Sequence, residues 1–594
     1  MRLADYIMLR LEEAGVRHVF LVTGRGALFL TDALAKNSSL KAVCNHHEQA
    51  SAFAAVGYAE QTGGIGACLV STGCASTNTI TGVLSAWQDA VPCIFISGQN
   101  VLKETTRHTG IPVRSYGQQE ADIVSIVKPI TKFAKMIESA DEIYDAMDEA
   151  LASAMSGRKG PVWIDVPLDL QSATVDPAAR RSVPMKSPKR VEASPEDIHE
   201  VVANLSAAKR PVLFLGGEAK GSSATARIEK FVQNWNIPVV FDGSVPDIYG
   251  SANRLSIGSV GSMGCNRAGS FAVQNADLIL VLGSRLTSII TGPDFCKFAR
   301  EAKVVAVDVD ASEHKKESIK IDRFILSEIS DFLEQINQVP ARPCDSSWVG
   351  KCLHWKGIFG AVEPQFRCGD RVDLYQLAEV LGRVLPKPST LVTDSGLIEV
   401  ILPTNIPFAS GVNCIHPFSQ GAMGFAIPAA IGAAYGKNQA VVAVVGDGSI
   451  MMNLQELETI RHNQLPIKIL VINNNAYSII RRRQRDLFRK RIIGTDPSNG
   501  VSCPDFAKVA ECFGFHYSQI QNPSEMEEKL RVVLASPVSE LCEIMGRENQ
   551  EYIEVGHART SKDNRFVRRP LEDQMPFLER DLFLSEMVIQ PIDQ

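Results

Sequence analysis

The sequence predicts an α/β protein in which three domains each carry a parallel sheet. The chain has 594 residues, more than a single hydrophobic core usually serves. Short apolar runs alternate with helix-like stretches along most of the chain, which is the pattern of repeated βαβ units. Two segments rich in proline, serine and charge, residues 172–197 and 338–347, interrupt that alternation and indicate linkers.

The first predicted domain covers residues 1–180. It opens with an amphipathic helix pattern, MRLADYIMLRLEEAG, which lacks the apolar core and cleavage site of a signal peptide. Five apolar runs follow, each ending in glycine or a polar turn, and we expect them to be strands: HVFLV, KAVCN, GACLVST, CIFISG and VWIDVP. A helix-like stretch follows each run, so the block predicts a parallel sheet.

The second predicted domain covers residues 190–340 and the third covers residues 365–550. Their strand candidates are RPVLFLGG, IPVVFDG, LILVLGSRL and VVAVDVD in the second, and TLVTDSG, AVVAVVGDGS, IKILVINNN and LCEIMG in the third. The first and third domains have similar length and pattern, which favours a duplicated fold around a middle domain. The tail, residues 551–594, is charged and aperiodic, and we expect it to wrap over the surface or to lie near the active site.

Composition limits the classes of function. An apolar content of 45%, a charged content of 22% and a net charge of −6 are typical of a globular protein and argue against a general polyanion binder. Thirteen cysteines without a repeated metal-ligand spacing predict reduced thiols. No apolar run reaches membrane-spanning length. We therefore expect a cytoplasmic protein with neither a membrane nor a nucleic-acid partner.

A basic stretch, SIIRRRQRDLFRKR at residues 478–491, stands out against this mildly acidic background. Such a cluster is typical of a nucleic-acid patch, but it is also typical of a solvated helix face. The stretch begins a few residues after Asn474, so its interpretation depends on the motif that precedes it.

That motif is a GDGS turn at residues 446–449, followed by a predicted helix at 453–462, a predicted strand at 467–472 and then Asn474. A right-handed βαβ crossover brings both strand ends to one edge of the sheet, so Asp447 and Asn474 become neighbours. A carboxylate, an amide oxygen and a backbone carbonyl form a partial ligand set for Mg²⁺ that phosphate oxygens complete. The N–H groups of Gly448 and Ser449 would face the same phosphates. A structural Asp-Gly turn would explain an isolated GDG, but not this whole arrangement.

GDGS followed by two asparagines at this distance is the thiamine diphosphate signature, and residues 1–550 resemble the acetolactate synthase group of thiamine diphosphate enzymes. CNHHEQASAFAAVGYA, STGCASTNTITGVLSAWQDAVPCIFISGQ and QGAMGFAIPAAIGAA match the same group. The resemblance implies a pyrimidine-binding domain, a middle domain and a diphosphate-binding domain in that order.

The resemblance assigns catalytic positions to Glu48 and Gln119. Glu48 would hydrogen-bond the aminopyrimidine ring and promote proton removal at the thiazolium carbon. Met423 would support the bent conformation of the cofactor, although methionine is more often plain core. The other implied cofactor contacts are Gly24, Thr72, Asn78, Ser395, Gly421, Gly446, Gly448, Ser449 and Tyr477.

The implied metal ligands are the side chains of Asp447 and Asn474 and the carbonyl of Ala476. Because Glu48 and Asp447 belong to different domains, the resemblance also implies a site at a subunit interface. We therefore expect at least a homodimer.

Departures from acetolactate synthase cluster around the expected substrate. Arg25 replaces a glycine in the loop near the reactive carbon, and Gln118-Gln119-Glu120 replaces Phe-Gln-Glu. Leu397-Ile398 replaces a Gln-His pair, and Arg483 falls where the group has a specificity tryptophan. Since arginine suits phosphate or carboxylate, Arg481 to Arg485 would face an anionic acceptor. Arg489 to Arg491 are as well explained by a solvated or subunit-facing helix.

The whole pattern is also similar to acetolactate synthase-like carboligases of surface-polysaccharide pathways. This resemblance implies decarboxylation of a 2-keto acid, expected to be pyruvate, and acyl transfer to a carbonyl acceptor such as a nucleotide-linked keto sugar. Acetolactate synthase proper and a 2-hydroxyacyl-CoA lyase remain alternatives, and so does a non-enzymatic protein that kept the fold. The intact Glu48, Asp447 and Asn474 argue against the last.

The middle domain resembles that of acetolactate synthase, which binds FAD. The resemblance places Gly216, Gly217, Arg285 and Asp308 at FAD positions. Related middle domains keep similar glycines without a flavin, so FAD is allowed and not required.

Overall fold

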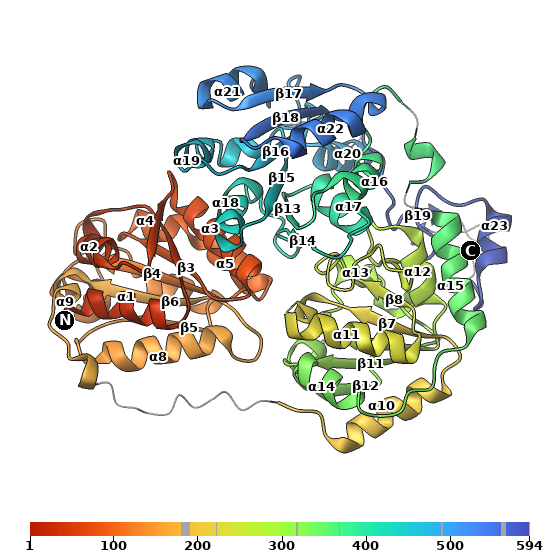
Figure 1. Cartoon of the computed structure of the whole chain (residues 1–594), viewed down its shortest axis with the longest axis horizontal. Helices are drawn as coiled ribbons and strands as arrows, with labels where there is room; N and C mark the ends of the chain where they lie inside the picture. Colours follow the sequence, from red (N-terminus) through yellow and green to blue (C-terminus); the bar gives the residue numbers. More distant parts are fainter. Residues whose placement is uncertain are drawn as a thin grey trace.

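The computed structural model describes residues 1–179, 191–220, 222–316, 319–360, 362–367, 369–488, 491–559 and 566–592. Within these residues the chain forms three six-stranded sheets and a small two-stranded one (Figure 1). All strand pairs described in the three large sheets are parallel, and helices cover the faces of these sheets. The predicted fold class is confirmed.

The first sheet has the strand order β2-β1-β3-β4-β6-β5. Its strands are β1 (His18–Leu21), β2 (Lys41–Cys44), β3 (Gly66–Val70), β4 (Cys93–Gln99), β5 (Phe133–Met136) and β6 (Val162–Pro167). Its helices are α1 (Leu3–Glu13), α2 (Leu28–Lys36), α3 (Glu48–Thr62), α4 (Cys74–Asn78), α5 (Ile80–Gln88), α6 (Thr106–Thr109), α7 (Ile123–Val127), α8 (Glu142–Met155) and α9 (Leu168–Gln171).

The second sheet has the strand order β12-β11-β10-β7-β8-β9. Its strands are β7 (Pro211–Leu215), β8 (Val239–Phe241), β9 (Ser256–Ser259), β10 (Leu278–Leu282), β11 (Lys303–Asp308) and β12 (Arg323–Leu326). The helices are α10 (Pro195–Ala207), α11 (Ser222–Trp235), α12 (Arg267–Gln274), α13 (Ser288–Thr291), α14 (Ile329–Ile336) and α15 (Ser346–Phe359). Residues 180–190 of the first predicted linker lie outside the described residues.

The third sheet has the strand order β14-β13-β15-β16-β18-β17. Its strands are β13 (Ser389–Thr393), β14 (Val412–Ile415), β15 (Ala440–Gly446), β16 (Lys468–Asn473), β17 (His516–Ile520) and β18 (Glu540–Met545). The helices are α16 (Leu374–Val384), α17 (Leu397–Asn405), α18 (Ala426–Gly436), α19 (Glu456–His462), α20 (Ser478–Phe488), α21 (Phe506–Phe513) and α22 (Met526–Ala535). The helix expected at 453–462 begins later, at Glu456, as α19, and a 3₁₀ turn, Ile450–Met452, precedes it.

Helices α3 and α18 join the first and third domains. Both are built of small and apolar residues that are buried along most of their length. Gly57 lies so close to α18 that an added Cβ would stand 2.2 Å from the carbonyl oxygen of Ala429. The rings of Phe53 and Phe425 meet edge to face at 5.2 Å. One apolar core therefore continues from the first domain into the third.

The tail crosses from the third domain to the middle domain, where α23 (Arg580–Glu586) lies beside α15 (Figure 1). The strands β19 (His557–Arg559) and β20 (Phe566–Arg568) form the small antiparallel sheet. Arg267, which is 2% exposed, donates to the carbonyl of Gln574 at 2.8 Å. Trp355 donates to Glu586 at 3.0 Å. These contacts attach the tail to the middle domain.

Candidate thiamine diphosphate site

The carboxyl ends of β13, β15 and β16 lie side by side in the third sheet. Ser395 follows the first of these strands, Asp447 the second and Asn474 the third. Open α/β sheets bind ligands at such an edge. The predicted diphosphate-site residues are therefore gathered where a ligand would bind, because the parallel order of the strands places their loops together.

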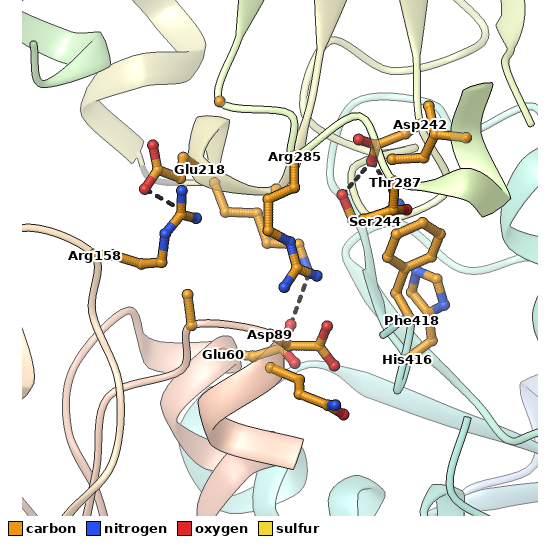
Figure 2. Close-up of a pocket in the computed structure, with 16 residues that line it drawn as sticks. Glu60, Asp89, Arg158, Glu218, Asp242, Ser244, Arg285, Thr287, His416 and Phe418 are labelled. Carbon is orange, nitrogen blue, oxygen red and sulfur yellow. Dashed lines mark hydrogen bonds and ion pairs between the residues drawn. The ribbon is translucent and has the colours of Figure 1, made fainter. Parts of the chain in front are cut away.

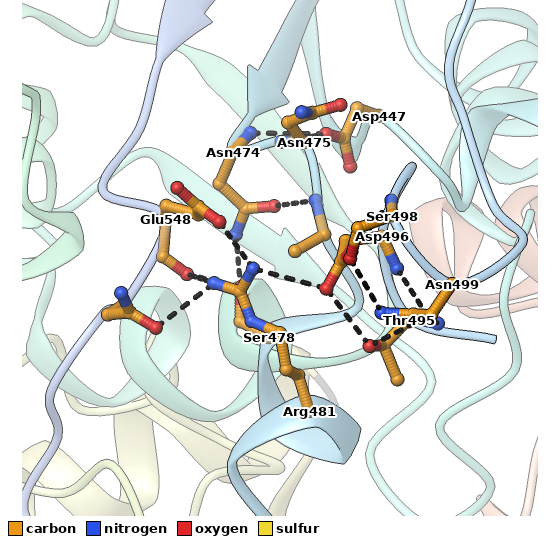
Figure 3. Close-up of polar contacts among 12 residues, drawn as sticks. Asp447, Asn474, Asn475, Ser478, Arg481, Thr495, Asp496, Ser498, Asn499 and Glu548 are labelled. Atoms are coloured by element: carbon orange, nitrogen blue, oxygen red, sulfur yellow. Dashed lines mark hydrogen bonds and ion pairs between the residues drawn. The ribbon is translucent and has the colours of Figure 1, made fainter. Parts of the chain in front are cut away.

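Asp447 follows β15, which lies between β13 and β16. Its Oδ2 atom accepts from the N–H of Asn474 at 3.1 Å and of Asn475 at 2.6 Å (Figure 3). Its Oδ1 atom accepts from the N–H of Gly448 at 2.7 Å. This last bond corrects the expectation that the Gly448 N–H faces a phosphate, since the turn directs it at the adjacent carboxylate. Burial raises the pKa of Asp447, although the three N–H donors counteract this.

Asn474 lies beside Asp447, as predicted. Its Oδ1 atom accepts from the N–H of Ala476 at 3.2 Å and its Nδ2 atom donates to Ser478 at 2.6 Å. Carboxylate, amide and carbonyl oxygens are the donors that Mg²⁺ prefers. Among the described residues no group of three His, Cys, Asp or Glu side chains gathers as a metal site. The residues at this edge fit a metal that completes its shell with diphosphate oxygens.

Asp394, which the sequence analysis did not single out, connects three of the predicted cofactor loops. It is fully buried and accepts from the N–H groups of Ser395 at 2.8 Å, Gly424 at 3.1 Å and Ala426 at 2.8 Å. The Ser449 hydroxyl also donates to it. Met423 therefore sits in a loop fixed directly to the GDGS turn. The sequence did contain a signal for Asp394, because an acidic residue directly follows a predicted buried strand, at the strand end where ligands bind.

Three other predicted residues, Tyr477, Gly421 and Gly446, lie at this edge. The ring of Tyr477 packs against Gly448, and the N–H of Tyr477 donates to the carbonyl of Thr495 at 2.8 Å. Gly421 stands in the loop before Met423 with a φ of +59°, in the left-handed region that favours glycine. Gly446 is the last residue of β15.

Glu48 occupies the first turn of α3, at the carboxyl edge of the first sheet. Its Oε2 atom accepts from Asn78 at 2.9 Å, so the structure brings two predicted residues together. The neighbouring Gln49 accepts from Asn453 at 3.2 Å. Glu456 accepts from the N–H of His46 at 2.9 Å. The start of α3 is thereby fixed to the segment that follows the GDGS turn.

Arg25 lies at a small cavity that also includes Thr72, Gln118 and Gln119 in its lining. Its guanidinium donates to the side-chain oxygen of Gln118. Thr72 is buried and donates to the side-chain oxygen of Gln99 at 2.7 Å. Gly24 precedes Arg25, so the predicted substrate arginine lies beside predicted cofactor and catalytic positions. Both Arg25 and Gln118 are exposed in the single chain.

Residues 478–488 of the basic stretch form α20, which starts close to Asp447 and Asn474, since Asn474 donates to Ser478. Arg481 is buried and donates to the carbonyl of Glu548 at 2.6 Å (Figure 3). Arg482 and Arg483 donate to Glu554 at 2.6 Å and 3.1 Å. The expectation that Arg481 to Arg485 jointly face an acceptor is thus too broad, because acidic residues of the following segment already pair with three of them.

The remaining cations of the stretch differ in exposure. Arg483 has a side chain that is 51% exposed, so part of it is available to a ligand. Arg485 is equally exposed and lies 3.5 Å from Asp486. Arg489 and Lys490, which we expected to be solvated or subunit-facing, lie outside the described residues.

The chain matches three family descriptions in order. They are "Thiamine pyrophosphate enzyme, N-terminal TPP binding domain" over residues 1–126, "central domain" over 198–336 and "C-terminal TPP binding domain" over 394–544. It is 30% identical to the acetolactate synthase large subunit of Haemophilus influenzae over 551 residues, which cover 89% of this chain and 91% of that protein. The chain belongs to the acetolactate synthase group of thiamine diphosphate enzymes.

Other members of the group are similar over the same span. The chain is 29% identical to acetolactate synthase isozyme 1 large subunit of Escherichia coli over 545 residues, which cover 90% of this chain and 92% of that protein. Against the acetolactate synthase large subunit of Lactococcus lactis it is 30% identical over 546 residues, covering 89% and 90%. The resemblance expected from the motifs is confirmed, and this chain is a thiamine diphosphate-dependent carboligase. Within the described residues no helix combines the length and apolarity needed to cross a bilayer.

Proposed function

We propose that this carboligase decarboxylates pyruvate and transfers the acyl unit to the carbonyl of an anionic acceptor, with a nucleotide-linked keto sugar as the leading candidate. The observation that carries the proposal is the position of Arg25, whose guanidinium is held by Gln118 at a cavity shared with Thr72 and Gln119. An arginine there favours a phosphate or carboxylate over a small uncharged partner.

Thiamine diphosphate and Mg²⁺ are the proposed cofactors. Asp447, Asn474 and the carbonyl of Ala476 would hold the metal, and Asp394 would keep the loop of Met423 in place against the GDGS turn. The chemistry that thiamine diphosphate supplies when bound is a thiazolium carbon acid that becomes a nucleophile towards 2-keto acids.

Glu48 is the proposed proton-handling group. Its carboxylate is oriented by the side-chain N–H of Asn78 at 2.9 Å, which leaves its other oxygen to share a proton with the aminopyrimidine ring. Gln119 has a φ of +57°, a conformation that few residues adopt, and it lies at the Arg25 cavity. Its proposed role is to contact the substrate.

At least a homodimer is the proposed assembly, because Glu48 and Asp447 belong to different domains and a second copy would complete the site. Exposed apolar side chains in the third domain, after the GDGS turn and on α20, are consistent with such an interface. They are Met451, Met452, Ile480, Leu487 and Phe488. Light scattering coupled to gel filtration tests the proposal. A purely monomeric active protein would contradict it.

Acetolactate synthase itself is the second candidate, and its support is the 30% identity to acetolactate synthases over about nine-tenths of both chains. The deciding experiment incubates cofactor-loaded protein with ¹³C-labelled pyruvate and separate acceptors, namely nucleotide-linked keto sugars, a second pyruvate and 2-ketobutyrate. Mass spectrometry should show a labelled two-carbon unit on the keto sugar. Labelled acetolactate as the sole product would instead assign the second candidate, and cleavage of a 2-hydroxyacyl-CoA in a parallel reaction would assign the lyase.

A further inference from the structure

The middle sheet has its own candidate ligand crevice. Its strand order reverses between β10 and β7, and ligands of open α/β sheets bind at the carboxyl ends of strands at such a point. Gly216 follows β7, Arg285 lies just after β10 and Asp308 ends β11. Of the residues that the sequence placed at FAD positions, Gly217 and Arg285 line this crevice (Figure 2 labels Arg285). Gly216 precedes Gly217, and Asp308 contacts Arg158, which also lines the crevice.

An arginine from the first domain occupies the crevice. Arg158 follows α8, and its guanidinium contacts Asp308 at 2.8 Å and Glu218 at 3.2 Å (Figure 2 shows the second pair). The side chain of Asp308 is fully buried and that of Glu218 is 10% exposed. Charges buried in this way depend on one another, because each alone would carry a large desolvation penalty.

The charge of the crevice opposes a diphosphate. Glu218, Asp242 and Asp89 line the crevice together with Glu60. The cations are Arg158, Lys220 and Arg285, of which Lys220 already pairs with Glu60 at 2.7 Å. Burial raises the pKa of Glu218, and the negative charge of the neighbouring Asp308 raises it further. Two phosphates would add to that charge.

The backbone after β7 offers few donors to a phosphate. The N–H of Gly216 donates to Leu282 at 3.0 Å, that of Glu218 to Gly283 at 3.2 Å and that of Ala219 to Gly216 at 2.9 Å. Dinucleotide sites need such N–H groups for the ligand. Gly216 also has a packing explanation, since an added Cβ would stand 2.3 Å from the Cα of Ser284.

Space in the crevice is small as well. Its cavity of about 50 Å³ compares with roughly 300–1,000 Å³ for ordinary cofactor sites. A neighbouring cleft of about 600 Å³ shares Gly217, Glu218 and Lys220 with the crevice, but Arg285 does not line it, and neither lining includes Gly216 or Asp308. Arg285 instead donates to Ser419 of the third domain.

We infer that this crevice is not a dinucleotide site and that Arg158, paired with Glu218 and Asp308, closes it as an ionic clamp between the first and middle domains. The residues placed at FAD positions therefore do not fit the flavin, and their roles are packing and domain contact. The clamp occupies the position that a dinucleotide would otherwise take.

The decisive experiment measures flavin binding without reference to activity. Purified protein loaded with thiamine diphosphate and Mg²⁺ is denatured, and the supernatant is assayed for flavin fluorescence; a second sample is titrated with FAD by calorimetry. We expect only trace flavin and no saturable binding. One tightly bound FAD per chain in either assay would overturn the inference.

A variant pair tests the clamp itself. Arg158→Met leaves Glu218 and Asp308 facing each other without a buried cation, so we expect the first thermal transition to fall by several degrees. Lys159→Met is the matched control, because Lys159 is the next residue and is exposed. An Arg158→Met melting curve identical to that of the control would contradict the clamp. If Arg158→Met does not fold, Arg158→Lys replaces it, with a smaller fall expected and an unchanged curve again counting against the clamp.

Discussion

The carboxylate of Asp447 accepts a hydrogen bond from the N–H of Asn475 at 2.6 Å, across 28 residues of sequence. This bond joins the loop after β15 to the loop after β16, and it fixes the orientation of the only carboxylate in the proposed metal shell. The βαβ crossover creates the proximity, and the backbone donors of the Asn-rich loop set the angle of the side chain. The arrangement of the proposed metal ligands therefore follows from the order of the strands and from the two short loops after β15 and β16.

Replacing Asp447 tests the metal edge. Asp447→Ala removes the charged ligand and leaves the diphosphate charge poorly neutralised. We expect affinity for thiamine diphosphate in the presence of Mg²⁺ to fall by at least about tenfold, measured by calorimetry. Asp486→Ala, on the exposed side of α20, is the control. Near-normal affinity in a folded Asp447→Ala protein would rule out the assignment.

Asp394 offers a second test, because it fixes two loops of the proposed cofactor site, the Met423 loop and the GDGS turn. Asp394→Asn places an N–H₂ group among four hydrogen-bond donors, so at least one donor loses its acceptor. A lost bond to a charged acceptor costs about 1.5–3 kcal/mol. We expect weaker cofactor binding together with a lower melting temperature. Unchanged cofactor affinity would show that the Met423 loop does not depend on this anchor.

Arg25 should affect the acceptor and not the cofactor. For Arg25→Met we expect the kcat/KM for an anionic acceptor to fall roughly tenfold, while release of CO₂ from pyruvate alone changes little. The effect is modest because Arg25 is exposed in the single chain. Arg17→Met, also exposed and in the same domain, should leave both rates unchanged. Equal loss of both activities would place Arg25 in cofactor binding instead.

Arg483→Trp tests the helix that carries the basic stretch. The substitution removes one of the two arginines on Glu554 and restores the residue type expected at this position in acetolactate synthase. We expect weaker use of an anionic acceptor and improved use of 2-ketobutyrate. If acceptor preference does not change while thermal stability falls, the role of Arg483 is to hold the Glu554 segment.

Asp165 should make stability depend on pH. Burial raises its pKa to about 7, although Ser97 and Gln99 donate to it. Because this folded-state pKa lies above the unfolded value, the stability it contributes is present at low pH and lost as pH rises through about 7. From pH 5 to pH 8, Asp165→Asn should therefore gain about 2–3 kcal/mol relative to the wild type in urea unfolding. A difference that is constant with pH would contradict this.

The strands that the sequence analysis missed share one property. β5, β9, β12, β14 and β17 all lie at sheet edges. Interior strands of a parallel sheet are covered on both faces and read as apolar runs, whereas an edge strand can be short or polar. β9 reads SIGS and β17 reads HYSQI, which no apolar-run search would find. The central strands were predictable because burial on both faces fixes their composition.

In the candidate site, too, the sequence could predict only those contacts that the order of the strands fixes. Asp447 and Asn474 follow from strand order, because neighbouring parallel strands place their ends together. The Arg158 clamp could not be found this way, since it depends on how two domains dock and not on local pattern. The pairing of Arg482 and Arg483 with Glu554 is similar, because the partner lies beyond two further strands. The role of a charged run therefore cannot be inferred from the sequence until the fold shows which residues pair with it.

The central claim is that Glu48 activates thiamine diphosphate held at the Asp447 edge, and the most direct measurement is proton exchange at the thiazolium C2 carbon in deuterated water. Glu48→Gln keeps the hydrogen bond from Asn78 possible but cannot share a proton with the pyrimidine. We expect the variant to bind the cofactor normally while its exchange rate falls by roughly two to four orders of magnitude. Exchange as fast in Glu48→Gln as in the wild type would contradict the claim.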